Sequence, residues 1–305
     1  MSIPKITKPH IALIIVCIVW GTTYLVNKIG VHLIPAFTFT AIRQLLAGGL
    51  ILTYFFILKK TPFPSRQYLL FQLVLGLLMI SIGNGIGTYG LKYIDSGVSA
   101  IFAAFSPIVI ALLTIQYNPA DRLNAKGWLG IFLGFCGMIL ICYDKLGTQG
   151  AESSMLGIIL TVISVVSWGF GSVYSKARYF DVNPILSAGF QMFIGGIPLL
   201  IASLLFEKPW TIHFPMEIYF VWLYLIILGS VVAYSAYIYA LKHLPATLVS
   251  IQSYINPIVA IFLGALFLKE RVSINMLFGA GLTLLGVFLV NFAMFKKTAR
   301  FMRRN

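Results

Sequence analysis

The sequence predicts an all-α integral membrane protein with ten transmembrane helices, arranged as two inverted five-helix repeats. Three observations support this prediction. Hydrophobic residues make up 59% of the 305 residues and charged residues only 10%, and the mean hydropathy is +0.94, values typical of a membrane-embedded chain. The apolar residues fall into ten runs of membrane-spanning length. The motifs of the first five runs recur in the last five.

The ten spans follow from the lengths of the apolar runs. Crossing about 30 Å of hydrocarbon takes roughly 20 helical residues. The chain has such runs near residues 10–30, 36–58, 68–91, 97–117, 127–143, 155–176, 184–206, 218–241, 247–268 and 274–295. The segments between them, such as 59–66 and 207–215, are short and rich in proline and charge, as expected for loops.

The distribution of basic residues predicts the orientation. Of the 22 Lys and Arg residues, fifteen lie on the side that holds both termini, six lie on the other side, and Arg43 lies within a span. Because positive residues are retained in the cytoplasm, we expect both termini there, in the inner (plasma) membrane. The basic tail is expected to contact anionic lipid. The basic residues are spread too thinly to form a face for nucleic acid.

Sequence motifs divide the chain into two repeats, residues 1–150 and 151–305. Trp-Gly occurs in VCIVWGTTYLVNKIG (16–30) and again in VVSWGFGSVYSKARYF (165–180). QLLAGG (44–49) matches QMFIGG (191–196), and PIV (107–109) matches PIV (257–259). Five spans per repeat is an odd number, so the second repeat must enter the membrane inverted, an arrangement typical of transporters. A duplication that merely built a larger bundle is the alternative.

Polar residues recur on one face of the first and sixth spans. They are spaced by three, four and seven residues, so they share a helix face. The residues are Trp20, Thr23, Tyr24 and Asn27 in the first span and Trp168, Ser172 and Ser175 in the sixth. We expect these stripes to line a shared polar cavity, with hydrogen bonding between helices as the alternative. Lys28 and Lys176, which end the stripes, are expected to extend to the membrane interface.

Two prolines mark helix breaks in corresponding spans. Pro107 and Pro257 each remove a backbone donor at membrane depth. Ser106, Gln252 and Asn256 lie beside them. Broken helices in corresponding positions of two repeats are typical of a transporter's binding site. A purely mechanical kink is the alternative.

The third and eighth spans supply further candidates for the cavity. These are Ser81, Asn84, Thr88 and Tyr89 in the third span and Ser230, Tyr234 and Tyr237 in the eighth. Tyrosine suits a binding site because its ring faces cations and its hydroxyl donates to carboxylates.

Arg43 is a charged residue inside the second span, where it is costly to bury. All eight acidic residues fall in loops or at span ends. Arg43 could satisfy backbone carbonyls near the proline breaks, reach a loop acid, or attract the carboxylate of a substrate.

No catalytic or metal-binding cluster is evident. The four histidines are isolated near span ends, so no cofactor or metal is expected. Cys17, Cys136 and Cys142 lie in apolar runs without paired spacing and are expected to be free thiols.

The chain resembles the EamA-type branch of the drug/metabolite transporter superfamily. The resemblance rests on the duplicated Trp-Gly, the LKY and LKH after spans 3 and 8, SPIV and NPIV at mid-span, and LKERVS before a Gly-rich last span. It implies a ten-helix inverted-repeat carrier, often exporting amino acids or other small metabolites. The implied cavity is lined by helices 1, 3, 4, 6, 8 and 9, with helices 5 and 10 peripheral. The first-repeat counterpart of LKERVS reads PADRLN, with Asp121 in place of the usual glutamate.

The resulting prediction is a carrier in the lipid bilayer that exports amino acids or similar small zwitterionic or anionic metabolites by alternating access. Nucleotide-type or lipid-linked substrates are an alternative, and a membrane enzyme or scaffold is a further one. Glycines in the fifth and tenth spans, at 130, 134, 137, 279 and 286, predict either close packing within one chain or the seam of a homodimer.

Overall fold

A computed structural model describes residues 7–117, 123–146, 151–176, 178–244, 246–249 and 252–302. Asp121, Arg122 and the side chains of the basic tail from residue 294 onward lie outside the described part. All regular elements within it are helices, which agrees with the predicted fold class. In the first half they are α1 (Lys8–Leu33), α2 (Ala36–Thr53), η1 (Tyr54–Leu58), α3 (Arg66–Leu75), η2 (Gly76–Ile86), α4 (Gly87–Gly90), α5 (Ser96–Ala103), α6 (Ser106–Tyr117) and α7 (Ala125–Leu146). In the second half they are α8 (Ala151–Tyr174), α9 (Pro184–Ala202), η4 (Ser203–Glu207), η5 (Pro209–Thr211), α10 (Met216–Tyr224), η6 (Leu225–Val232), α11 (Ala233–His243), α12 (Ala246–Val249), α13 (Gln252–Leu268) and α14 (Ile274–Met302).

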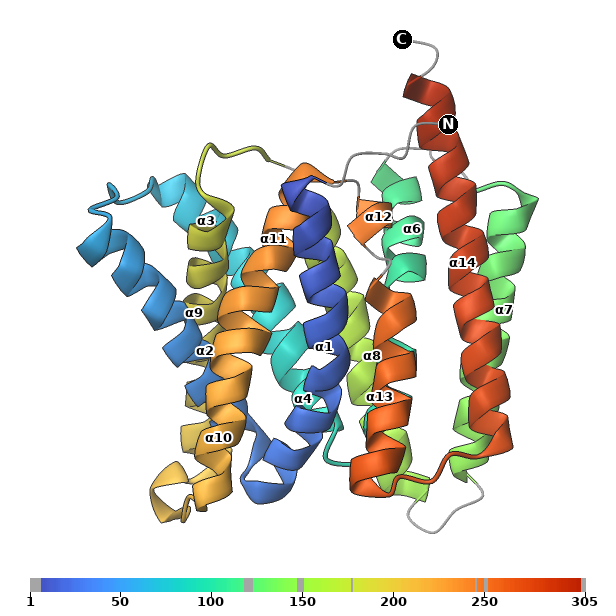
Figure 1. The fold of residues 1–305 in the computed structure, drawn as a ribbon, viewed down its shortest axis with the longest axis horizontal. Helices are drawn as coiled ribbons and strands as arrows, with labels where there is room; N and C mark the ends of the chain where they lie inside the picture. The colour runs from blue at the N-terminus through green and yellow to red at the C-terminus, as the bar shows by residue number, and fades with distance from the viewer. Residues whose placement is uncertain are drawn as a thin grey trace.

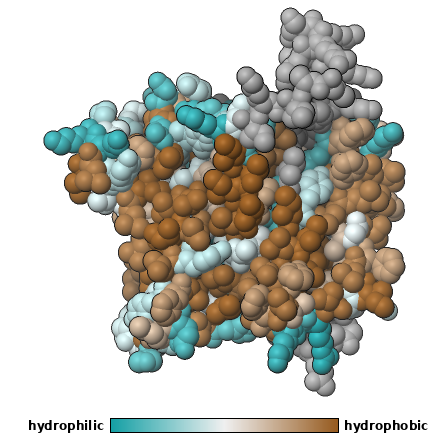
Figure 2. Space-filling view, viewed as in Figure 1, coloured by the Kyte–Doolittle hydropathy of each residue, from teal (hydrophilic) through white to brown (hydrophobic). Residues whose placement is uncertain are grey.

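These elements account for the ten predicted spans. Nine helical segments of the described chain are long and apolar enough to cross a membrane, and α13 is a shorter apolar helix of 17 residues. α1 begins and α14 ends at the same end of the bundle (Figure 1). Figure 2 shows apolar side chains covering the middle of one face, with hydrophilic residues gathered toward its top and bottom. The fold is therefore that of a multi-pass membrane protein.

The two prolines act differently on their helices. The fourth span is interrupted at Ala104–Phe105, directly before Pro107, as the prediction requires. Pro257, in contrast, lies inside α13, which continues as a helix on both sides of it. The predicted kink at this proline stays a prediction. Because Pro257 has no N–H, the carbonyl of Ser253, four residues earlier, lacks its intrahelical donor. The chain tolerates that loss without ending the helix.

Two glutamates cap helix N-termini at the end of the bundle opposite the chain termini. Glu207 accepts hydrogen bonds from the backbone N–H of Phe37 (2.9 Å) and Thr38 (2.6 Å) at the start of α2. Glu270 accepts from the backbone N–H (2.8 Å) and hydroxyl (2.8 Å) of Ser96 at the start of α5. A carboxylate suits this position because the first N–H groups of a helix have no intrahelical acceptor and the helix dipole is positive there.

Two lysines bind carbonyl groups at the C-terminal ends of helices. Lys28 donates to the carbonyls of Leu91 (2.6 Å) and Ile94 (2.7 Å), just after α4. Lys176 donates to the carbonyls of Leu241 and Leu244 at the end of α11. Lys28 is only 8% exposed, so the prediction that it extends to the interface is wrong. The unpaired carbonyls at the helix end give its ammonium group acceptors inside the protein.

Glycines bring α7 and α14 into close contact at the right-hand edge of the bundle in Figure 1. A Cβ atom on Gly130 would lie 2.6 Å from the carbonyl oxygen of Gly286, and one on Gly137 would lie 2.5 Å from that of Gly279. These glycines therefore pack within one chain, as the first of the two sequence alternatives requires. The homodimer stays a prediction.

Gly286→Ala should destabilise this contact, because the added methyl group would meet the backbone of Gly130 and Gly134. We expect a loss of about 1–3 kcal/mol, read as a lower thermal unfolding temperature of the purified protein in detergent. Gly281→Ala is the matched control on the same helix, because no atom lies within 4 Å of the added methyl. Equal effects of the two substitutions would contradict close packing at Gly286.

Candidate functional site

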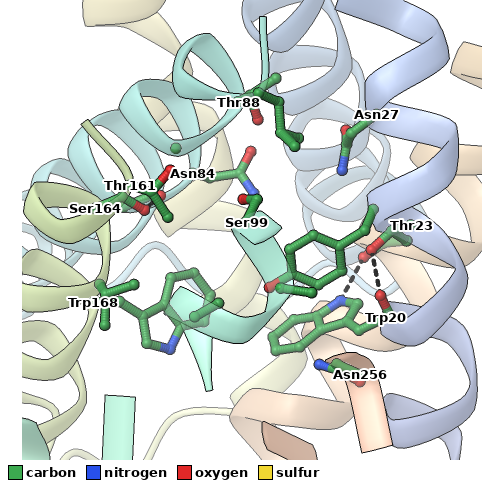
Figure 3. A pocket seen from close by; sticks show the side chains of 18 of the residues that line it. Trp20, Thr23, Asn27, Asn84, Thr88, Ser99, Thr161, Ser164, Trp168 and Asn256 are labelled. Carbon is green, nitrogen blue, oxygen red and sulfur yellow. Dashed lines mark hydrogen bonds between the residues drawn. The ribbon is translucent and has the colours of Figure 1, made fainter. Parts of the chain in front are cut away.

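A polar cavity lies among the helices in the middle of the bundle. It encloses ≈ 1040 Å³ of space that no protein atom fills, including its opening to solvent. Its wall is built by α1, α2, η2, α4, α5, α6, α8, η6, α11 and α13. The resemblance implied every one of these spans except the second, which contributes Arg43 and Gln44. Figure 3 shows Asn27, Asn84 and Thr88 on one side of the cavity and the two tryptophans and Asn256 on the other.

The structure gathers most of the predicted site residues in this cavity. Thirteen of the eighteen line it: Trp20, Thr23, Tyr24, Asn27, Arg43, Asn84, Thr88, Ser106, Trp168, Ser230, Tyr234, Gln252 and Asn256. Residues far apart in the sequence thus share one wall. Their role in binding a substrate stays a prediction.

Five predicted residues lie outside the cavity wall. Tyr237 lies behind Trp168 and accepts a hydrogen bond from its indole N–H at 3.2 Å, and its hydroxyl lies 3.1 Å from Ser172 Oγ. Ser175 donates to the carbonyl of Ser172 within the same turn. Tyr89 lies at a helix end, where it stacks on Phe37 with a centroid distance of 4.8 Å. Ser81 donates to the carbonyl of Gly195 at 2.7 Å. Helical spacing places these residues near the stripe, but their polar groups bond to other protein groups, within the same helix for Ser175 and to Trp168 for Tyr237.

The sequence analysis missed five polar residues of the wall. They are Gln44, Ser99, Thr161, Ser164 and Ser253. The helical spacing could have predicted two of them. Thr161 and Ser164 precede Trp168 by seven and four residues, so they lie on the same helix face and extend the stripe by two turns. Ser99 and Gln44 carry no comparable signal in the sequence.

Arg43 is the cationic residue of the described cavity wall, and it is only 4% exposed. Its Nε donates to Ser230 Oγ at 3.0 Å and its Nη1 donates to Asn27 Oδ1 at 2.9 Å. Within the described residues no carboxylate forms an ion pair with it, and no Asp or Glu lines the cavity. Two of its sequence alternatives, backbone carbonyls near the prolines and a loop acid, are therefore wrong. The guanidinium has five N–H donors, so a ligand could be bound by those left over.

Three acceptors in the cavity wall have no hydrogen-bond donor within the described chain. They are the side-chain amide oxygens of Gln44, Gln252 and Asn256, all buried. A buried acceptor without a donor costs about 1–3 kcal/mol, so such groups point to a ligand that donates. Gln252 and Asn256 lie one turn apart on α13, which places their oxygens on one helix face.

An aromatic cluster forms one side of the cavity. Trp20 and Trp168 meet edge to face with ring centroids 5.6 Å apart, and Tyr237 lies 5.0 Å from Trp20 and 5.5 Å from Trp168. The indole N–H of Trp20 donates to the carbonyl of Gly229 at 3.1 Å. Because both indole N–H groups are bonded within the protein, the cluster presents mainly ring faces and edges to a ligand.

Paired polar contacts recur at corresponding places in the two halves. Gln44 donates to Asn84 Oδ1 at 3.0 Å in the first half. In the second half, Tyr234 donates to Gln191 Oε1 at 2.6 Å. Gln44 and Gln191 occupy the same place in the QLLAGG and QMFIGG motifs, and Asn84 and Tyr234 are 150 residues apart, as are the repeated PIV motifs.

Metal ligands are not grouped in the described chain. No group of three or more His, Cys, Asp or Glu residues there could hold a metal ion. Cys17, Cys136 and Cys142 are free thiols.

Tyr237→Phe should destabilise the aromatic cluster, because the indole N–H of Trp168 would lose its acceptor. We expect a cost of about 1 kcal/mol, measured as a fall in thermal unfolding temperature and followed by tryptophan fluorescence. The control is Tyr219→Phe, where the tyrosine is 52% exposed. If both variants unfold like the parent, the hydroxyl of Tyr237 does not support Trp168.

Comparisons with known proteins identify the family. The model of the EamA-like transporter family matches residues 7–143 and residues 155–292. The inner membrane transporter YedA of Escherichia coli is 30% identical over 256 residues, covering 83% of this chain and 80% of YedA. The transporter YoaV of Bacillus subtilis is 25% identical over 285 residues, covering 93% of this chain and 97% of YoaV. Both are named as uncharacterized transporters, and neither name states a substrate.

A solved crystal structure shares the fold. Its TM-score is 0.67 over 93% of this chain and 97% of the other, at 18% sequence identity. The two matches of the family model together span most of the sequence, and both relatives named above are transporters. The protein described here therefore belongs to the EamA-like transporter family.

Proposed function

We propose that this membrane transporter exports amino acids or similar small zwitterionic or anionic metabolites by alternating access. The observation that carries the proposal is Arg43, a buried cation in the cavity wall whose described neighbours include no carboxylate ion pair. A buried charge is costly unless it is paired. A substrate carboxylate would supply that pairing, and a bidentate contact with the guanidinium would fix its orientation.

The amide oxygens of Gln252 and Asn256 support a substrate that also carries an ammonium group. Both oxygens are buried acceptors without a donor in the described chain. An ammonium group has three N–H donors and can serve both, while the nearby ring of Trp20 favours a cation over its face. Within the described residues, the cavity wall holds one basic residue and several neutral acceptors, which suits a zwitterion. A nucleotide with several phosphates would require more cations in the wall.

Two inverted repeats, residues 1–150 and 151–305, would provide the alternating access. The family model matches the chain twice. Lys28 and Lys176 make equivalent contacts at residues 91 and 94 and at residues 241 and 244. Such repeats can exchange conformations around a central site. We place the protein in the inner (plasma) membrane with both termini in the cytoplasm, from the excess of basic residues on that side. Export is the direction that the family resemblance implies.

Arg43→Gln should weaken recognition of the substrate carboxylate selectively. The purified protein is reconstituted into proteoliposomes and screened with labelled amino acids under imposed pH and voltage gradients. For the solute that is transported, we expect Arg43→Gln to weaken binding on the order of 100-fold, since truncating one partner of a buried charge pair costs about 2–5 kcal/mol. Binding of the corresponding amide should change much less.

The control for this experiment is Arg66→Gln, which removes an exposed arginine at the start of α3 and should leave transport unchanged. An equal loss for the acid and the amide would assign Arg43 a structural role. Failure of every amino acid and small carboxylate to move would contradict the proposed function.

Gln252→Leu and Asn256→Leu should weaken recognition of the ammonium group. We expect each to reduce binding of the amino acid by about tenfold, equivalent to 1.4 kcal/mol, because a donor–acceptor contact to a charged group is lost. Binding of the analogue without the amino group should be nearly unchanged. Gln67→Leu, at an exposed position of α3, is the control. Parallel losses for both ligands would show that these residues do not contact the ammonium group.

A further inference from the structure

A second cavity opens at the end of the bundle where α1 begins and α14 ends. It lies between the ends of α3, α8, α9 and α11 at the top of Figure 1. It encloses ≈ 730 Å³ of space that no protein atom fills, including its opening. Its apolar sides include Phe71, Leu75, Ile238 and Leu241. None of the predicted site residues except Ser175 lines it.

The described wall of this cavity carries three cations and no acid. Lys176, Arg178 and Lys242 line it. Lys242 Nζ donates to the carbonyl of Val182 at 3.0 Å, and Lys176 Nζ donates to the two carbonyls that end α11. These acceptors are neutral, and all three basic side chains are exposed. Asp181 is exposed and does not line the cavity.

Two buried glutamines form its inner wall. Gln72 is 3% exposed and Gln191 is 2% exposed. Gln191 Nε2 donates to Gln72 Oε1 at 2.7 Å, and Tyr234 donates to Gln191 Oε1 at 2.6 Å. Gln72 accepts from Gln191 through its Oε1, so its amide nitrogen is the group that can donate to a ligand in the cavity. Since Tyr234 also lines the central cavity, the chain of hydrogen bonds Tyr234–Gln191–Gln72 separates the two cavities.

We propose that this second cavity is a binding site for small organic anions, in which Lys176, Arg178 and Lys242 attract a carboxylate and Gln72 donates to it. It would hold the transported molecule on the side of the termini, and the Tyr234–Gln191–Gln72 chain would separate it from the central cavity. Only the identity of that molecule rests on the proposed function. The positive potential and the polar inner wall are properties of this cavity alone.

A free small anion fits this cavity better than an anionic lipid. A lipid headgroup would satisfy the basic residues near the opening, but its acyl chains would offer no acceptor to the amide nitrogen of Gln72 deep in the wall. A small carboxylate can enter far enough to accept from that nitrogen and still face the cations. The three exposed cations share one sign and line one cleft, so they raise the local concentration of anions there.

Thiol modification tests the proposal without knowledge of the substrate. Ser187→Cys places a thiol in the cavity wall, in a background carrying Cys17→Ala, Cys136→Ala and Cys142→Ala. The rates of modification by negatively and positively charged methanethiosulfonates of similar size are compared in nanodiscs of neutral lipid. Gln67→Cys, exposed on the same end of α3, is the matched control position.

We expect the negative reagent to be favoured roughly tenfold more at position 187 than at position 67, because three cations line the same cavity as the thiol. Adding Arg178→Gln and Lys242→Gln should bring the ratio down toward the control, while glutamine keeps a donor for the carbonyl of Val182. Small carboxylates such as glutamate should slow modification at position 187 only.

The proposal would be overturned if the rate of modification by the negative reagent, relative to the positive one, were equal at positions 187 and 67. It would also be overturned if the two glutamine substitutions left this rate ratio unchanged at position 187. Protection by anionic lipid in the nanodisc but not by free carboxylate would assign the cavity to a lipid headgroup instead. The readout needs no transport, so it separates this site from the central one. If Arg43→Gln failed to alter transport while the negative reagent was still favoured at position 187, the proposed function would fail and the anion site would stand.

Discussion

Hydrocarbon offers no hydrogen-bond partner, so every polar group inside this protein must be satisfied by the chain or by a ligand. Helices satisfy the backbone groups of their interiors, and charged side chains satisfy several of those left over at helix ends. Glu207 and Glu270 bind the N–H groups that open α2 and α5, and Lys28 binds the carbonyls that follow α4. These contacts use charged groups as fixed partners of the backbone and hold the spans in register.

Several polar groups of the cavity wall, in contrast, are not fully hydrogen-bonded by the described chain. Arg43 keeps spare donors and meets no carboxylate among the described residues, while Gln252 and Asn256 present acceptors without donors. A positive donor and neutral acceptors left open in the same cavity are complementary to a molecule that carries both a carboxylate and an ammonium group. The same physical constraint thus explains both the bonded helix ends and a cavity that suits a polar ligand.

Side chains, rather than backbone segments, separate the central cavity from the second cavity. The rings of Trp20, Trp168 and Tyr237 pack together on one side of the central cavity, and Tyr234 bonds to Gln191 beside them. Side chains change rotamers faster and at lower cost than helices move. A partition of this kind can open without unfolding any span. The third span contains the π-helical segment η2, and the eighth span, which carries Tyr234, contains η6. Such local irregularities are common at functional sites.

The sequence by itself determined the membrane class, the span positions to within a few residues and more than half of the polar residues in the described cavity wall. Apolar run length, the spacing of three and four residues around Trp20 and Trp168, and the duplicated motifs are local signals that hydrocarbon enforces directly. Tertiary structure alone decided which helices meet. It placed Arg43 against Ser230, 187 residues away, turned Tyr237 behind Trp168, and left α13 continuous through Pro257. It also used the glycines of α7 and α14 for packing within one chain. Helical periodicity defines a face but not its neighbour, because partner helices are chosen by packing and hydrogen bonding across the whole bundle.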